Sequence, residues 1–90
     1  MGWTSARKLR EVVANVRAVL SVEIVAASQA IDFRADVAEP GAASGAVHRL
    51  VRTQVPTMDA DRNVAVQLAA VDALLAEIVG AAEAAVGALA

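Results

Sequence analysis

The sequence contains no cysteine, no tyrosine, one tryptophan and one phenylalanine in 90 residues. The absence of cysteine excludes a disulfide-based scaffold and a structural zinc site built on thiolates. The apolar fraction is nevertheless 58%, and it consists mostly of 23 alanines and 15 valines. Because these side chains are small and the chain is short, a core made from them stabilises a monomer only marginally. We therefore expect one small domain, or a piece of a larger protein, that depends on partners.

The charged residues are few and mixed in sign. Eight basic and ten acidic side chains give a net charge of −2 and are interleaved along the chain, which excludes nucleic acid binding because that needs a basic face. Glu11, Arg17 and Glu23 interrupt the apolar stretch that a signal peptide would need. The longest uncharged runs, 40–48 and 63–71, are nine residues each. Since that is about half of a membrane span, we expect no membrane segment and a cytoplasmic location.

The first third of the chain has the periodicity of a long helix. Its main apolar residues recur every three or four positions and so form one stripe: Leu9, Val13, Val16, Leu20, Ile24, Ala27 and Ile31. We predict a helix over about residues 4–32, with Thr4 or Ser5 as its N-cap. After Val22 the helix is apolar nearly all round, so neighbouring helices must enclose it.

The remainder of the chain predicts a linker, a short helix and a second long helix. Residues 35–44 contain proline and glycine and are interpreted as the linker. A short helix over about 45–55 follows, with Ser44 as its cap and Pro56 after its end. After a turn, a helix over about 62–88 is indicated by a second stripe: Val64, Leu68, Val71, Leu75, Ile78, Ala82, Val86 and Leu89. Alanines line its reverse face, and Gly80 and Gly87 are expected to make its last turns fray.

Together these patterns predict an all-α fold in the order long helix, loop, short helix, turn, long helix. Residues 1–90 contain no internal repeat and no second domain, so we interpret them as a single helical segment. Two long apolar stripes are more than so short a chain can bury, which is typical of a piece of a larger helical bundle.

Two features suggest chemistry, and we interpret both as structural. Ala43-Ser44-Gly45 is the tripeptide that certain ammonia-lyases cyclise into an electrophilic methylidene-imidazolone, but that cyclisation needs a strained, enclosed loop. Here the tripeptide lies in an open linker, so we interpret it as a decoy that caps the next helix. His48 has no cysteine or carboxylate at ligand spacing, and no serine has a glycine elbow or an acid–histidine pair in the sequence. We therefore predict no catalytic, cofactor-binding or metal-binding residue.

Four charged residues are assigned structural roles. Glu23 falls near the middle of the first stripe, where a carboxylate needs a partner, so we expect an ion pair with an arginine of a neighbouring helix. Arg7 lies on the flank of the same helix. Asp61 and Arg62 precede the last helix, and we interpret them as a cap and a packing clamp.

The first 34 residues carry a specific resemblance. Met1-Gly2-Trp3-Thr4-Ser5-Ala6-Arg7-Lys8, the pair Val22-Glu23 and the turn Ile31-Asp32-Phe33-Arg34 resemble the C-terminal part of the aromatic amino acid ammonia-lyases, closest to the histidine enzymes. In that family a helix begins at a similar Met-Gly or Leu-Gly step, continues with an Ile-Glu pair and ends in a Leu-Asp-Leu-Arg-like turn. Asp59-Ala60-Asp61-Arg62 resembles a later Asp-Arg step, although Gln67 stands where the family has an acidic residue.

The resemblance implies what the complete enzyme is. Members of the family are mostly helical homotetramers that eliminate ammonia, and the histidine enzymes convert L-histidine to trans-urocanate in histidine catabolism. Their methylidene-imidazolone, catalytic tyrosines and substrate-binding residues lie upstream of the matching region, so none is carried onto this chain, which has no tyrosine. The chain is then inactive alone and packs against the remainder of the lyase subunit and, through its helical stripes, in a homo-oligomer. The substrate of the complete enzyme, whether histidine, phenylalanine or tyrosine, stays open.

Two other interpretations are kept. The chain is alternatively an independent helical module that oligomerises through the same stripes, without catalysis. A stop codon directly upstream of Met1 favours that module, whereas an in-frame Glu-Asp-His-Val-Ser-like stretch favours the lyase. The third interpretation, a lyase active by itself, predicts urocanate on adding histidine, and we expect none.

Overall fold

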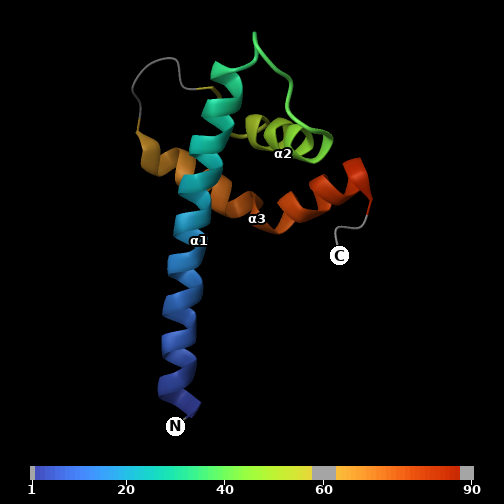
Figure 1. Ribbon diagram of the computed structural model, residues 1–90. Helices are drawn as coiled ribbons and strands as arrows, with labels where there is room; N and C mark the ends of the chain where they lie inside the picture. The colour runs from blue at the N-terminus through green and yellow to red at the C-terminus, as the bar shows by residue number, and fades with distance from the viewer. Residues whose placement is uncertain (1, 58–62, 88–90) are drawn as a thin grey trace.

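The computed structural model describes residues 2–57 and 63–87 of the chain. These residues form three helices and no strand: α1 (Gly2–Phe33), α2 (Ala42–Arg52) and α3 (Val64–Val86) (Figure 1). The all-α class and the order of long, short and long helix that the sequence predicts are therefore confirmed.

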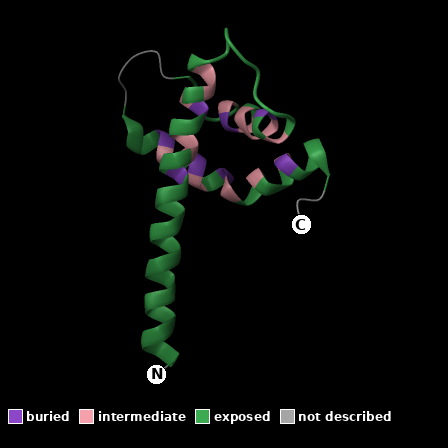
Figure 2. Cartoon of the chain, viewed as in Figure 1, coloured by how far each residue is buried: buried purple, intermediate pink, exposed green. Residues whose placement is uncertain are grey.

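The core lies where the three helices meet, at the C-terminal half of α1. In Figure 1, α3 crosses α1, and α2 lies beside the C-terminal end of α1, packed against α3. Val51, Val55 and Val71 are buried at the centre, and partly buried apolar residues surround them: Ile24, Val25, Val47, Ala70 and Leu75. Figure 2 shows that the buried residues gather at this junction. Because most of these side chains are valine and alanine, the core is small, as the composition predicts.

The N-terminal half of α1 extends away from this junction. Every residue from 2 to 20 is exposed, and Trp3 has an exposed fraction of 70%. The radius of gyration is 15.3 Å, whereas a compact domain of this length has about 12 Å. The expectation that neighbouring helices enclose α1 after Val22 holds only on one side, because Ser28 is buried but Val22 has an exposed fraction of 52%.

The start of α2 differs from the expectation. The helix begins at Ala42 instead of about residue 45, and its N-cap is Gly41, which has extended backbone angles and no side chain to form a cap bond. Ser44 lies inside the first turn, so its expected role as N-cap is wrong. The reason is that Pro40 and Gly41 already end the linker, after which Ala42 and Ala43 favour the helix. At the other end, Thr53 closes the helix by donating its backbone N–H to Leu50 O at 3.1 Å.

The ends of α3 are formed by Asn63 and Gly87. The Asn63 side chain accepts a hydrogen bond from the backbone N–H of Ala65 at 3.0 Å and so caps the first turn. Gly87 has a φ of 89°, a left-handed conformation that glycine adopts without strain, and its N–H donates to Glu83 O at 2.7 Å. Gly80 does not interrupt the helix, which is regular to Val86. Asp61, which the sequence predicts as a cap of this helix, lies outside the described residues.

One described helix, α3, is long and apolar enough to cross a membrane. The uncharged runs of the sequence predict no such segment, because acidic residues divide α3 into short runs. The mean hydropathy of α3 is nevertheless 1.8. A single helix of this kind is weak evidence of membrane insertion, since a helix in the core of a water-soluble protein has the same composition. In this chain α3 packs against both other helices, and Asp72 in its middle is paired with Arg17.

Candidate functional site

The C-terminal end of α1 carries Asp32, whose carboxylate is the centre of a hydrogen-bonded cluster. Its Oδ1 lies 2.9 Å from Nε2 of His48. Its Oδ2 accepts hydrogen bonds from Nε and Nη2 of Arg52 at 3.0 and 2.5 Å, and from Oγ1 of Thr57 at 3.0 Å. We call Asp32, His48, Arg52 and Thr57 the Asp32 cluster.

The Asp32 cluster joins three segments of the chain. His48 and Arg52 are four residues apart, so both project from the same face of α2 toward the end of α1. Arg52 also donates through Nη1 to Val55 O at 2.9 Å, which fixes the turn that follows α2. The side chains of Asp32, His48 and Arg52 are exposed by only 21, 19 and 16%. Charge-assisted bonds that are largely shielded from water are stronger than surface ion pairs, so the cluster fixes how α1 meets α2.

The electrostatics of the cluster keep Asp32 ionised. Partial burial acts to raise the pKa of Asp32, but the hydrogen bonds from Arg52 and Thr57, the positive charge of Arg52 and the hydrogen bond with His48 act in the opposite direction. The pKa therefore lies below the usual value of 3.8. A carboxylate held in this way is a stable anion at neutral pH and not a proton acceptor, so the arrangement is that of a structural clamp.

This cluster is not predicted from the sequence, in which His48 has no acidic partner at ligand spacing. The structure corrects this, because Asp32, sixteen residues earlier, supplies the carboxylate. The signal that could have found the pair is the i, i+4 spacing of His48 and Arg52 beside an acidic residue at the end of the preceding helix. No local motif links residues across the intervening linker.

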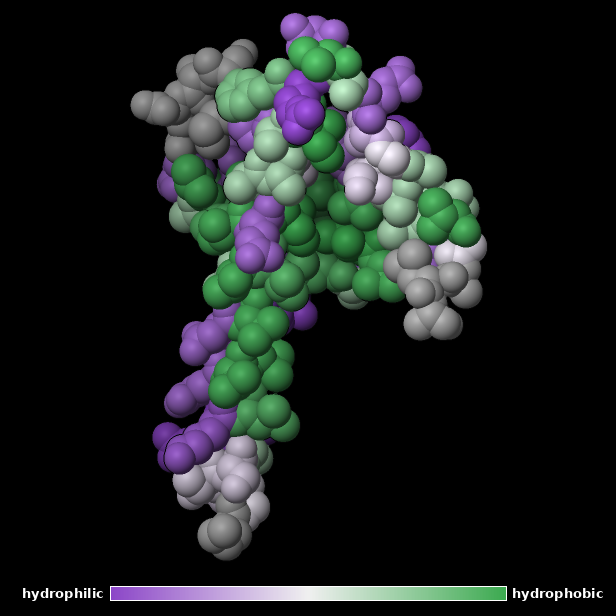
Figure 3. Space-filling view, viewed as in Figure 1, coloured by the Kyte–Doolittle hydropathy of each residue, from purple (hydrophilic) through white to green (hydrophobic). Residues whose placement is uncertain are grey.

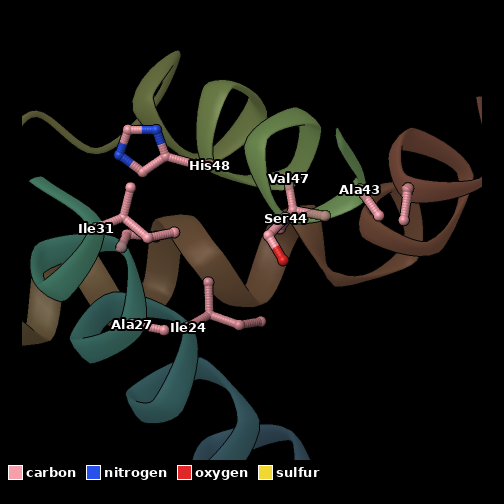
Figure 4. Close-up of a pocket in the computed structure, with 9 residues that line it drawn as sticks. Ile24, Ala27, Ile31, Ala43, Ser44, Val47 and His48 are labelled. Carbon is pink, nitrogen blue, oxygen red and sulfur yellow. The ribbon is translucent and has the colours of Figure 1, made fainter. Parts of the chain in front are cut away.

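A mostly apolar pocket of about 290 Å³ lies next to the cluster, between all three helices. It is lined by Ile24, Ala27, Ser28, Ile31, Ala43, Ser44, Val47, His48 and Ala82. In Figure 4 the two ring nitrogens of His48 are turned away from Ser44, and one of them, Nε2, is bonded to Asp32. His48 therefore has no nitrogen directed at Ser44, and these two residues do not form a nucleophile–base pair.

Ala43-Ser44-Gly45 adopts ordinary helical geometry in the first turn of α2. The N–H of Gly45 donates to the carbonyl of Gly41 at 2.7 Å. Formation of a methylidene-imidazolone requires this same nitrogen to approach the carbonyl carbon of Ala43. As folded here, the three residues do not fit that group.

Of the four residues to which the sequence assigns structural roles, two lie in the described part of the chain. Glu23 and Arg7 are both exposed on α1, and within residues 2–57 and 63–87 neither takes part in an ion pair. Asp61 and Arg62 lie outside the described residues. The structural roles of these residues stay predictions.

Arg17 and Asp72 form the ion pair that joins α1 to α3. Nε of Arg17 donates to Oδ1 of Asp72 at 3.0 Å, and Nη2 donates to the backbone oxygen of the same residue at 3.0 Å. Both side chains are nearly half exposed, so the pair contributes less to stability than the Asp32 cluster. In the part of the chain that is described, no group of three acidic, histidine or cysteine side chains could hold a metal ion.

Comparison with known proteins shows the family. Residues 1–53 match the model of a family described as aromatic amino acid lyase. The chain belongs to this family. Asp32 and His48 both lie inside the matched range, and α3 lies beyond it.

Several histidine ammonia-lyases are similar to the chain. The enzyme of Streptomyces coelicolor is 44% identical over 92 residues, which cover 99% of this chain and 18% of the relative. The enzyme of Myxococcus xanthus is 43% identical over 75 residues, covering 83% of this chain and 15% of the relative. That of Sorangium cellulosum is 38% identical over 91 residues, covering 99% of this chain and 18% of the relative. The chain thus spans less than a fifth of the length of these relatives. No solved structure matches it significantly.

Proposed function

We propose that this chain is the C-terminal helical part of a methylidene-imidazolone-dependent ammonia-lyase, that the complete enzyme converts L-histidine to trans-urocanate and ammonia, and that the chain is inactive alone. The observation that supports this most is the 44% identity to a histidine ammonia-lyase over 99% of the chain. The elimination breaks the bond between Cα and nitrogen and removes a proton from Cβ. Ala43-Ser44-Gly45 does not fit the electrophile, and the carboxylate of Asp32 accepts hydrogen bonds from Arg52 and Thr57 and so is not a free base.

The role of the chain is packing. The core of the three-helix junction is formed by Val51, Val55 and Val71, which are already buried. The N-terminal half of α1 extends away from this junction with its apolar side chains exposed. The exposed apolar side chains of α1 would be covered by the remainder of the lyase subunit and by neighbouring subunits of a homotetramer. The methylidene-imidazolone, formed upstream in the complete enzyme, would supply the electrophile. A cytoplasmic location belongs to the same proposal.

A chimera tests the proposal. In the histidine ammonia-lyase of Streptomyces coelicolor, the segment that matches this chain is replaced by residues 1–90, and urocanate formation is followed by its ultraviolet absorbance. We expect the chimera to assemble and to form urocanate, while the 90-residue chain alone forms none. A chimera in which the same segment is deleted is the control and should be inactive.

Two results would contradict the proposal. A chimera that assembles but forms no urocanate would show that these helices do not support the active site of the lyase. Urocanate formed by the chain alone would show that it holds a catalytic site. The alternative function, a stand-alone interaction module, is supported by the exposed apolar face of α1. A stop codon directly upstream of Met1, together with a purified chain that folds into a stable oligomer, would favour it.

A further inference from the structure

The pocket between the three helices has no role in the proposed lyase reaction. We call this space of about 290 Å³ the junction pocket. Six of its nine lining residues are apolar, and the other three are Ser28, Ser44 and His48. Ala27 and Ser44 are exposed, so a small molecule can enter without unfolding the junction. Because an apolar cavity of about 150 Å³ holds a benzene molecule, the junction pocket has room for one ring with a short substituent.

Ser28 gives the junction pocket an unused hydroxyl group. The residue lines the pocket with an exposed fraction of only 4%, and within residues 2–57 and 63–87 its Oγ forms no hydrogen bond. Ser21, about two turns earlier on the same helix, has an exposed fraction of 1% and donates to Arg17 O at 2.9 Å. A buried hydroxyl group without a partner is unfavourable. A molecule that brings a polar group into the pocket would satisfy it.

The lining of the junction pocket excludes charged molecules. Among the described residues that line it, none is aspartate, glutamate, lysine or arginine. His48 lines the pocket, but its Nε2 is bonded to Asp32, whose charge is balanced by Arg52. A charged molecule would therefore lose its hydration on entry without gaining an opposite charge. Amino acids and carboxylates do not fit, and these include the histidine and urocanate of the proposed lyase reaction.

We propose that the junction pocket binds a small neutral molecule with an apolar body and a single hydroxyl group, which forms a hydrogen bond with Oγ of Ser28. A hydroxyl group suits this position because it can both donate and accept, as the serine can. The apolar body would lie against Ile24, Ile31 and Val47, the largest apolar side chains of the lining. This binding site goes beyond the lyase assignment, because it depends only on the folded junction.

The single histidine and the single tryptophan of the chain allow binding to be located by proton NMR. The probe is benzyl alcohol, a ring with one hydroxyl group. Its titration should shift the ring signals of His48 with a Kd of about 1 mM. The indole signal of Trp3 should stay unchanged. Trp3 belongs to the N-terminal half of α1, which has apolar side chains exposed along one edge (Figure 3), so it reports unspecific binding there.

Ser28→Ala tests the hydrogen bond, because it removes the hydroxyl group and leaves the pocket open. The affinity for benzyl alcohol should fall about tenfold, since the hydroxyl group of the probe then enters the pocket without a partner. The affinity for toluene, which has no hydroxyl group, should not fall. Ser21→Ala is the matched control, because Ser21 is a buried serine of the same helix outside this pocket. It should bind benzyl alcohol as the wild type does.

A second variant tests the location. Ala82→Leu places a larger side chain at a buried position of the lining and should abolish the shift of the His48 signals. Circular dichroism checks that each variant keeps its helices, and if Ala82→Leu unfolds, Ser28→Ala still decides.

Three results would overturn the proposal, and none of them would affect the chimera test. The first is a set of His48 signals that do not move at about fifty times the expected Kd. The second is a shift of the Trp3 signal as large as that of His48, which would mean unspecific binding to exposed apolar side chains. The third is a Ser28→Ala chain that binds benzyl alcohol as well as the wild type does, or that loses as much affinity for toluene.

Discussion

The two halves of α1 belong to the same helix but to different environments. The C-terminal half is held by a carboxylate that accepts bonds from both α2 and the turn after it, and it packs on a core of valines. The N-terminal half has an equally regular apolar stripe, yet all of it is exposed. The comparison shows that periodicity predicts which face of a helix is apolar, while cross-chain contacts decide which part of that face is covered within the chain.

The largest expected effect comes from removing the carboxylate of Asp32 at the C-terminal end of α1. In Asp32→Ala, Arg52 and His48 lose a largely buried partner, which should lower the free energy of unfolding by about 3 kcal/mol. Urea unfolding followed by circular dichroism measures it. Asp36→Ala, an exposed acid four residues later, should change stability by less than about 0.5 kcal/mol. Equal losses in the two variants would contradict a clamp at Asp32.

The same substitution in the buried core and in the exposed half of α1 sharpens the comparison. Val71→Ala opens a cavity in the fully buried core and should cost about 2 kcal/mol in the free energy of unfolding. Val13→Ala removes the same atoms from the exposed N-terminal half of α1 and should lower the free energy of unfolding by less than about 0.5 kcal/mol in dilute solution. Thermal unfolding at low protein concentration separates them. A loss of stability in Val13→Ala as large as that in Val71→Ala would show that the N-terminal half of α1 is buried in solution.

Acidification should remove the contribution of Asp32 to the stability of the C-terminal half of α1. Because the pKa of Asp32 is lower in the folded than in the unfolded chain, its contribution to stability is complete above the unfolded value of 3.8 and is lost as the pH falls through the lower, folded value. The melting temperatures of the wild type and Asp32→Asn should therefore differ at neutral pH and converge as the pH falls below 3.8. The stability that the wild type loses through protonation of Asp32 should be smaller than the stability lost in Asp32→Ala, since a protonated carboxyl still forms hydrogen bonds. A difference that is independent of pH would rule out ionisation as the source.

The smallest effect concerns a polar group inside the junction. Gln67 has an exposed fraction of 5%, and its Nε2 is buried with no hydrogen-bond partner. Gln67→Met keeps the length of the side chain and removes the unsatisfied donor, so the free energy of unfolding should rise by about 1 kcal/mol. Gln54→Met, at an exposed position on the same side of the junction, should leave it unchanged. A less stable Gln67→Met chain would mean that the amide has a partner in solution.

Much of the fold could be predicted from local patterns, and the clamp could not. The spacing of Leu9, Val13 and Val16 is enough to predict a long helix, because a helix brings residues three and four apart onto one face. The start of α2 was misplaced because Ser44 is a good cap by type, while Pro40 and Gly41 had already ended the linker. The Asp32 cluster needs residues 16 to 25 positions apart to meet, and that depends on the path of the linker. Periodicity alone contains no such information.

The continuity of α1 has a mechanical consequence. Because the helix has no break, its N-terminal half is a lever about 27 Å long from Ser21 to Trp3, with its pivot at the three-helix junction. A tilt of about 5° at the pivot moves the tip by about 2 Å, half the width of a side-chain contact. The hydrogen bonds around Asp32 therefore determine the position of the N-terminal tip of α1, although they lie far from it. Altering these bonds would displace the tip before it affected formation of the helix.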